Sequence, residues 1–229
     1  MRVISLPALA APMTPYQRAD GATPHLVAKI GGSLWLSPLL GEWIAALRRF
    51  PHPLTIVPGG GPFADAVRAA QPVMGFSTHA AHGMALLAME QYALALADVH
   101  AGLALVSTPH EAARVHARGG VALWRPFAMV RGASDIAASW DVTSDSLAAW
   151  YALQAGAAAL LLIKSVDVDS SADLAAGDIV DPCFGEFSQG LTVFIAGPKA
   201  LSGTAAVFSA GGVPGTRLDL APSKQKIAS

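Results

Sequence analysis

The sequence has very little charge and a single cysteine. Only 14% of its 229 residues are Asp, Glu, Lys or Arg, and the formal net charge is -1. A nearly neutral chain has no overall field that attracts nucleic acid or an anionic membrane, so we expect any anion to bind at a local site. Cys183 has no companion for an internal disulfide or a structural zinc site, which is typical of a reducing compartment. These absences predict a cytoplasmic protein that binds neither nucleic acid nor membrane.

The sequence also lacks an unbroken hydrophobic run that would span a bilayer. The longest uncharged apolar stretch, 147–163, approaches the length of about 20 residues that a membrane helix needs. However, Gln154 and Gly156 divide it into a helix-like piece, 147–153, and a compact run, 157–163, which suits a buried parallel strand. Because 53% of all residues are hydrophobic, we interpret this stretch as part of a packed core.

We expect a single domain over residues 25–221, preceded by a flexible extension, 1–24, and followed by a polar tail, 222–229. No linker or repeat divides this region. Strand-like and helix-like stretches alternate, which predicts an α/β fold, a three-layer α-β-α sandwich with a mostly parallel central sheet. The expected strands are 25–30, 54–57, 103–106, 121–125, 159–166, 191–196 and 217–220. The expected helices are 38–49, 63–70, 78–101 (one long helix or two broken ones), 109–118, 144–154 and 199–210.

Lysine is rare in the body of the chain, so each lysine there calls for an explanation. Of five lysines, only Lys29, Lys164 and Lys199 lie outside the tail. Lys29 lies in the first expected strand and is followed by Ile-Gly-Gly-Ser, 30–33. Glycines let the backbone approach a ligand closely, and the lysine supplies positive charge, which together suit a phosphate. On its own, the pattern equally fits a strand that ends in a flexible Gly-Gly turn.

A second glycine-rich loop closes the second expected strand. The run Val-Pro-Gly-Gly-Gly-Pro, 57–62, contains three consecutive glycines, which weaken a fold unless something must approach that backbone. Pro62 suits the first position of a helix, whose N-terminus offers N–H groups to an anion. Neither loop matches G-x-x-x-x-G-K-[ST] or G-x-G-x-x-G, which excludes two common nucleotide-binding families. The candidate phosphate-binding residues are Gly31, Gly32, Ser33, Gly59, Gly60 and Gly61.

A third feature, Trp-Asp-Val-Thr-Ser-Asp-Ser-Leu at 140–147, opens an expected helix at the same edge of the sheet. Thr143 and Ser144 suit a helix cap, and Asp145 suits a partner of the helix dipole. Since Asp145 and Lys29 project from one edge, the carboxylate also suits orienting a lysine or holding a magnesium ion. Phosphoryl transfer needs mainly positioned positive charge and backbone donors, which this edge supplies.

These three motifs resemble, in order and spacing, those of the amino acid kinase superfamily, which includes acetylglutamate, uridylate and isopentenyl phosphate kinases. The resemblance covers about residues 25–220 and implies a kinase that uses ATP and Mg²⁺ and forms a homodimer or higher homo-oligomer. It implies that Lys29 stabilises the phosphoryl group in transfer, that the loop glycines donate N–H bonds to it, and that Asp145 orients lysines or organises the metal. No residue is assigned as a metal ligand.

The segment 162–167 resembles the nucleotide-side Thr-Asp-Val-Asp-Gly segment of that family. Lys164 stands in place of the threonine, and Val168 stands in place of the glycine. The resemblance implies nucleotide contacts, and the candidates for them are Lys164, Ser165, Asp167 and Gly197. Lys199 has no clear counterpart and fits a solvated lysine at the start of a helix equally well.

In finer detail the chain resembles the short kinases of methanofuran biosynthesis. The shared features are overall length, Val67-Arg68 after the triple-glycine loop, a histidine that opens a methionine-bearing helix (82–89), and Trp140 before Thr-Ser-Asp-Ser-Leu. This resemblance implies that [5-(aminomethyl)furan-3-yl]methyl phosphate is phosphorylated to its diphosphate. Arg68 and His82 are the acceptor-binding candidates, although a surface arginine and an ordinary helix histidine explain them too. The alternatives are a uridylate or isopentenyl phosphate kinase, or a non-catalytic relative that senses nucleotides or stores oxyanions.

Overall fold

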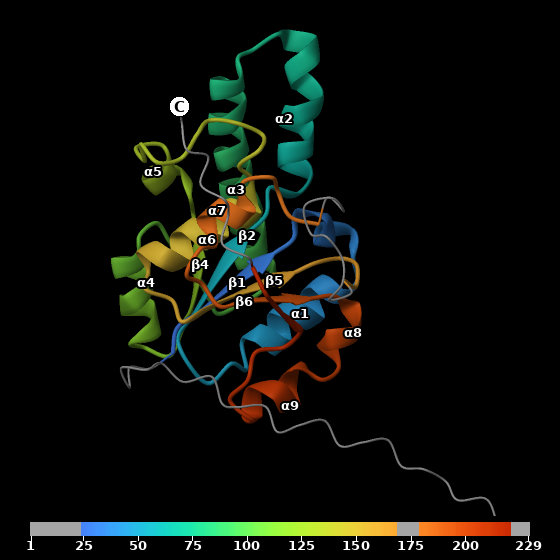
Figure 1. The fold of residues 1–229 in the computed structure, drawn as a ribbon, viewed down its shortest axis with the longest axis vertical. Helices are drawn as coiled ribbons and strands as arrows, with labels where there is room; N and C mark the ends of the chain where they lie inside the picture. Colours follow the sequence, from blue (N-terminus) through green and yellow to red (C-terminus); the bar gives the residue numbers. More distant parts are fainter. Residues whose placement is uncertain (1–23, 169–178, 221–229) are drawn as a thin grey trace, which may run out of the picture.

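The computed structural model describes residues 24–168 and 179–220, which form a seven-stranded sheet with helices on both faces (Figure 1). The sheet order is β3-β4-β2-β1-β5-β6-β7. β7 runs antiparallel to β6, and the other neighbouring pairs are parallel. The predicted mostly parallel α/β fold is confirmed. The strands are β1 (Leu26–Ile30), β2 (Leu54–Pro58), β3 (Leu103–Val106), β4 (Val121–Trp124), β5 (Ala159–Ile163), β6 (Val193–Ala196) and β7 (Thr216–Leu218).

The helices of the described residues connect these strands and match most of the expected ones. They are η1 (Gly32–Leu36, a 3-10 helix), α1 (Leu39–Leu47), α2 (Gly61–Met74), α3 (Thr78–Val99), α4 (Pro109–His116), α5 (Phe127–Val130), α6 (Ser144–Gln154), α7 (Phe184–Phe187), α8 (Pro198–Leu201) and α9 (Thr204–Ser209). The predicted N-terminal extension and C-terminal tail fall almost entirely on residues 1–23 and 221–229, outside the described residues. Those two segments and the domain boundaries therefore stay predictions.

Two hydrophobic cores hold helices against opposite faces of the sheet. On one face Trp43 of α1, Leu96 of α3 and Phe208 of α9 are buried against the strands. On the other face Tyr151 of α6 and Phe184 of α7 are buried. Strands β1, β2 and β5 are buried at every position because both of their faces are covered, which explains their continuous apolar sequences.

The uncharged stretch 147–163 divides as predicted. It contains most of α6, a turn at Gly156 and the whole of β5. From Asp145 to Ala152 every residue of α6 is buried, so this helix is apolar all round because it lies inside the protein. Within residues 24–168 and 179–220, no helix has both the length and the apolar character needed to cross a membrane.

Several elements differ from expectation, and η1, α5 and α7 were not expected at all. The expected helix 199–210 is interrupted after Leu201, and α9 starts after Gly203, consistent with the poor helix propensity of glycine. The expected strand 159–166 ends at Ile163, beyond which the chain turns away from the sheet. By contrast, α2 is longer than expected and ends at Gly75, whose φ of 72° is the left-handed conformation that terminates many helices.

Helices α2 and α3 form a hairpin that projects beyond the sheet (Figure 1). Since α2 follows β2 directly, the hairpin rises from the carboxyl edge of the sheet. Helix α3 is continuous, and the Ser77 hydroxyl caps it by accepting a hydrogen bond from the Ala80 amide at 3.2 Å. The hairpin thus forms a wall beside the edge where the three motifs were expected to meet.

Candidate active site

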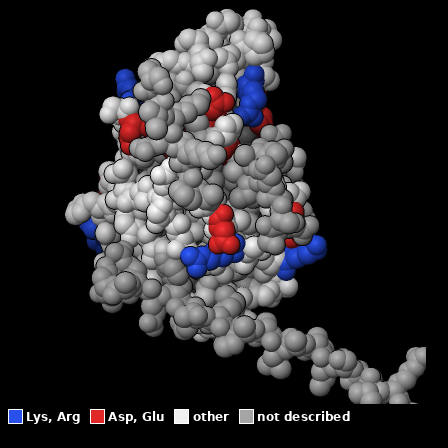
Figure 2. All heavy atoms as spheres, viewed as in Figure 1, with Lys and Arg blue, Asp and Glu red and all other residues white. Residues whose placement is uncertain are grey.

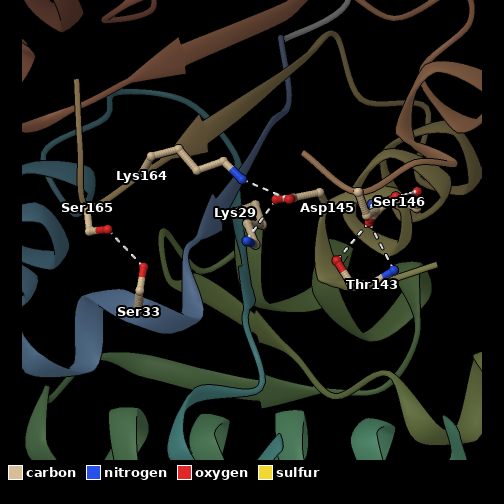
Figure 3. Close-up of polar contacts among 8 residues, drawn as sticks. Lys29, Ser33, Thr143, Asp145, Ser146, Lys164 and Ser165 are labelled. Carbon is tan, nitrogen blue, oxygen red and sulfur yellow. Dashed lines mark hydrogen bonds and ion pairs between the residues drawn. The ribbon is translucent and has the colours of Figure 1, made fainter. Parts of the chain in front are cut away.

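The carboxylate of Asp145 joins two lysines at the carboxyl edge of the sheet (Figure 3). Lys29 near the end of β1 places its Nζ 2.8 Å from Asp145 Oδ1, and Lys164 just after β5 places its Nζ 2.8 Å from Oδ2. Strands β1 and β5 are hydrogen-bonded neighbours, which brings the two lysines to one place. The Lys29 and Lys164 side chains are only 5% and 12% exposed, so this is a buried charged cluster.

The cluster carries an excess of positive charge. Burial alone would raise the pKa of Asp145, but the charges of Lys29 and Lys164 outweigh it and hold that pKa below its ordinary value. Burial and the charge of Lys29 lower the pKa of Lys164 to about 8, against the opposing effect of Asp145. An ammonium group has three donors, so each lysine keeps N–H groups for a further partner. A buried site with one carboxylate and two ammonium groups is suited to an anion.

The contacts of Asp145 bear on the three roles considered for it. Its two oxygens each contact a lysine, which is the arrangement that the predicted lysine-orienting role requires. Among the described residues, no group of three or more His, Cys, Asp or Glu side chains could hold a metal ion. With two ammonium groups beside one carboxylate, the protein residues at this site suit phosphates better than a dedicated metal centre. A magnesium ion there would depend on oxygens of a bound phosphate compound for most of its ligands.

A second buried carboxylate, Asp181, positions the start of α6. Its Oδ2 accepts hydrogen bonds from the Thr143 amide at 2.9 Å, the Thr143 hydroxyl at 2.8 Å and the Ser146 amide at 3.0 Å, and its Oδ1 accepts one from the Ser146 hydroxyl. Thr143 stands at the cap position as expected, yet its own side chain makes no capping bond, and neither does that of Ser144. The capping expectation is corrected: the capping oxygen comes from Asp181, 35 residues after Ser146.

The two glycine loops pack directly against each other. A Cβ atom on Gly59 would lie 2.4 Å from the amide nitrogen of Gly32, so only glycine fits. The amides of Gly31 and Gly59 donate to Ile163 O and Ile30 O, each at 2.9 Å, and so continue the hydrogen bonding between the strands. In the first turn of α2, Pro62 has no amide hydrogen and the Ala64 amide donates to Gly60 O at 3.2 Å. The remaining loop residues line a cavity. These residues are Gly32, Ser33, Gly60 and Gly61.

The cavity has a volume of about 230 Å³ and lies between the glycine loops and the α2–α3 hairpin. Both acceptor candidates line it, Arg68 from α2 and His82 from α3. The Arg68 guanidinium lies 4.5 Å from the centre of the Trp140 ring, which lines the cavity as well. Burial lowers the pKa of His82, opposed by a hydrogen bond with the Ser139 backbone. The structure brings together the phosphate loops and the acceptor candidates.

The other nucleotide-side candidates lie outside the lining of this cavity. The hydroxyl groups of Ser165 and Ser33 are 2.9 Å apart, which links the segment after β5 to the first glycine loop (Figure 3). Asp167 accepts a hydrogen bond from the Lys199 amide at 2.9 Å and so caps α8. A Cβ on Gly197 would lie 2.5 Å from the Cα of Asp167, which shows how closely these segments pack. The Lys199 side chain is 86% exposed, in agreement with a solvated lysine.

Charged side chains are sparse on the face of the molecule drawn in Figure 2. It shows isolated blue and red groups and no continuous basic surface among the described residues there. The buried pair Lys29 and Lys164, in contrast, concentrates positive charge around Asp145.

Comparisons with known proteins agree with this architecture. No protein-family model and no curated protein matches the sequence. Solved structures do match. The uridylate kinase of Archaeoglobus fulgidus has 16% identity and a TM-score of 0.62, over 85% of this chain and 99% of that one. The UMP kinase of Bacillus anthracis has 14% identity and a TM-score of 0.65, over 88% and 97%. The UMP kinase of Ureaplasma parvum has 13% identity and a TM-score of 0.63, over 85% and 98%. These likenesses span nearly the whole of each uridylate kinase, and the chain has the fold of those enzymes.

Proposed function

We propose that this protein is an ATP-dependent kinase that transfers the γ-phosphoryl group to the phosphate group of a small acceptor. The observation that carries the proposal is the buried Lys29–Asp145–Lys164 cluster at the carboxyl edge, where loops of a parallel sheet bind ligands. The glycine loops and the cavity with Arg68 and His82 lie beside it. The fold shared with uridylate kinases supports the same reaction class.

The proposed mechanism relies on positioned charge. An oxygen of the acceptor phosphate attacks the γ-phosphorus of ATP, the bond from that phosphorus to the bridging oxygen breaks, and ADP leaves. Because the acceptor oxygen is already ionised at neutral pH, no general base is needed. Lys29 and Lys164 stabilise the charge on the transferred group, and Asp145 holds both ammonium groups in place. Mg²⁺, when bound with ATP, supplies further positive charge to the phosphates.

For the acceptor we propose [5-(aminomethyl)furan-3-yl]methyl phosphate, which would make the protein part of methanofuran-type cofactor biosynthesis in the cytoplasm. The support is the resemblance of the segments around Arg68, His82 and Trp140 to the short kinases of that pathway. All three residues line one cavity of about 230 Å³, and Leu86 and Met89 supply an apolar wall. The cavity offers a cation for the phosphate and apolar surface for a ring. A homodimer or higher homo-oligomer stays a prediction.

The test is a coupled assay of ADP formation by the purified protein with three acceptors: the furan phosphate, UMP and isopentenyl phosphate. We expect turnover with the furan phosphate. Turnover of UMP alone would reassign the acceptor to the uridylate kinase type. ATP binding without turnover on any of the three would favour a nucleotide-sensing or oxyanion-storage protein, a reading that the replacement of the nucleotide-side glycine by Val168 supports.

A matched lysine series tests the assignment of the cluster. Lys29→Met and Lys164→Met remove a buried ammonium group that contacts Asp145, whereas Lys199→Met removes an exposed one. We expect the first two variants to lose turnover and the third to retain it. Full activity of Lys29→Met would refute the role of that lysine in phosphoryl transfer.

A further inference from the structure

Arg68 is poorly fixed by its own helix, although it lines the cavity of the proposed acceptor. Its side chain is 56% exposed. Its ion pair with Asp65 is long, at 3.6 Å, and the Asp65 side chain is 68% exposed. Exposed pairs of this kind contribute little to side-chain order. An arginine that recognises an anion must hold its guanidinium in a defined plane, so another contact has to orient it.

That contact is Trp140, which belongs to the loop before α6. The Arg68 guanidinium stacks over its ring at 4.5 Å. The indole is itself held, because its Nε1–H donates to Gln71 Oε1 at 2.7 Å, and Gln71 Nε2 donates to Phe76 O at 3.3 Å. Arg68 and Gln71 are three residues apart on α2 and share one face, so a single indole engages both. We name these three residues, Arg68, Gln71 and Trp140, the tryptophan latch.

The latch connects the acceptor wall to the helix that carries the catalytic carboxylate. Trp140 lies five residues before Asp145 in the segment that enters α6. Its loop is braced by Ser139 and Asp141, since the Ser139 hydroxyl donates to Asp141 Oδ2 at 2.9 Å and accepts from the Asp141 amide at 3.0 Å. The Ser139 backbone also contacts His82, the other acceptor candidate.

We propose that Trp140 and Gln71 are positioning residues, which act through Arg68 to hold its guanidinium at the mouth of the cavity for the anionic group of the acceptor. The inference rests on the proposed kinase function and deepens it. The ring of Trp140 fixes the plane of the guanidinium, and Gln71 fixes the ring. The latch acts on the acceptor only, because the lysines that serve the transferred phosphoryl group are held separately by Asp145.

The test compares Trp140→Leu, Trp140→Phe and Gln71→Met in steady-state kinetics. Trp140→Leu removes the cation–π contact with Arg68. From the usual free energy of such a contact at an exposed site, we expect KM for the acceptor to rise about fivefold. KM for ATP should stay unchanged. Trp140→Phe keeps a ring face and should raise the acceptor KM about twofold, as should Gln71→Met. Arg131→Met is the matched control, since Arg131 also lies over an aromatic ring, Phe127 at 5.6 Å, yet does not line the cavity.

A double-mutant cycle separates positioning from wall packing. If Trp140 acts through Arg68, Trp140→Leu should add nothing to the effect of Arg68→Met. An equal effect of Trp140→Leu with and without Arg68 would overturn the latch and make Trp140 part of the cavity wall. So would equal rises in both KM values together with a lowered Tm.

Calorimetric titration of the acceptor without ATP distinguishes failure of the proposed kinase function from failure of the tryptophan latch. A wild-type chain that binds a phosphorylated acceptor but transfers no phosphoryl group contradicts the kinase function, and the latch is then tested by the same variants through Kd. A wild-type chain that binds none of the three acceptors overturns the latch as well.

Discussion

The two edges of the sheet hold ionisable groups with different neighbours. At the carboxyl edge the buried Asp145 forms ion pairs with Lys29 and Lys164, whose charges keep its pKa below the ordinary value. At the amino edge the half-buried His25 and His116 lie around the buried Thr55, with ring centres 4.9 Å apart, and burial lowers the pKa of both. The contrast shows that burial alone does not decide the charge of a group, because the neighbours at each edge decide it.

The hydrogen bonds of the amino edge are compatible with neutral histidines. Thr55 Oγ1 is 3.0 Å from His25 Nε2 and 3.3 Å from His116 Nε2, and His116 Nε2 is 2.9 Å from Leu54 O. Because a carbonyl only accepts, His116 Nε2 carries the proton, and the Thr55 hydroxyl is then free to donate to His25 Nε2. Burial and the neighbouring His116 lower the pKa of His25 to about 4. At the amino edge the Thr55 hydroxyl and the two imidazoles therefore bond to groups of the protein itself. At the carboxyl edge the ammonium groups of Lys29 and Lys164 keep N–H donors for a ligand.

The largest expected effect comes from removing the charge of Asp145 at the carboxyl edge. Asp145→Asn keeps the shape of the side chain but leaves two buried ammonium groups without a counter-charge. We expect kcat to fall about 1,000-fold, because the lysines lose their orientation. We also expect the free energy of unfolding to fall by about 3 kcal/mol, as for a broken buried ion pair. Single-turnover kinetics and urea unfolding measure the two losses, and a variant with normal values of both would contradict the cluster.

The second prediction tests the neutral edge through pH. The folded-state pKa of His25, about 4, lies below its ordinary value of 6.5, so the unfolded chain takes up a proton first as the pH falls. Stability is therefore complete above about pH 6.5 and is lost progressively toward pH 4, by up to about 3 kcal/mol. Urea unfolding between pH 7.5 and pH 4 should show a smaller loss in His25→Gln. The exposed His110 provides the control, and His110→Gln should follow the wild type.

The third prediction uses the pH dependence of the charged edge. Lys164 has a pKa of about 8, so it loses its charge above that pH. We expect kcat/KM for ATP, which reports the free enzyme, to fall about tenfold per pH unit above pH 8. Lys164→Arg keeps its charge at these pH values, so its kcat/KM for ATP should stay constant above pH 8, even if its activity at pH 7 is lower. If kcat/KM for ATP still falls above pH 8 in Lys164→Arg, another group is responsible for the titration.

The smallest expected effect concerns Asp181, which is close to the cluster without contacting either lysine. Asp181→Asn weakens the charge-assisted bonds to Thr143 and Ser146, which position the first turn of α6. We expect a loss of about 1 kcal/mol in stability and a fall in kcat of about fivefold, with KM for ATP little changed. Asp98→Asn, on the exposed side of α3, is the control. Unaltered kcat in Asp181→Asn would limit its role to capping.

Much of the carboxyl edge could be predicted from the sequence. Lys29 lies near the carboxyl end of an expected strand and Asp145 lies in the first turn of an expected helix, and a parallel sheet gathers its strand-to-helix loops at one edge. The structure places the two side chains at that edge, 2.8 Å apart. The division of the stretch 147–163 into a buried helix and a buried strand was also predictable, because Gln154 and Gly156 interrupt it.

Other contacts left no signal in the sequence. Asp181 caps α6 from 35 residues downstream of Ser146, beyond the reach of any local capping pattern. His25 and His116 meet only because α4 returns to the amino edge next to β1 and β2. The stacking of Trp140 on Arg68 likewise depends on a loop that folds back on α2.

The sequence by itself determined the alternation of strands and helices, the two glycine loops and the placing of scarce lysines at strand ends. Those features depend on local periodicity, on backbone conformation and on the rule that parallel strands share a carboxyl edge. Only the tertiary structure places one carboxylate between Lys29 and Lys164, buries His25 at the other edge so that its pKa falls, and brings Trp140 against Arg68. The physical reason is that charge state and side-chain orientation depend on neighbours brought together by strand order and loop packing, which are distant along the chain.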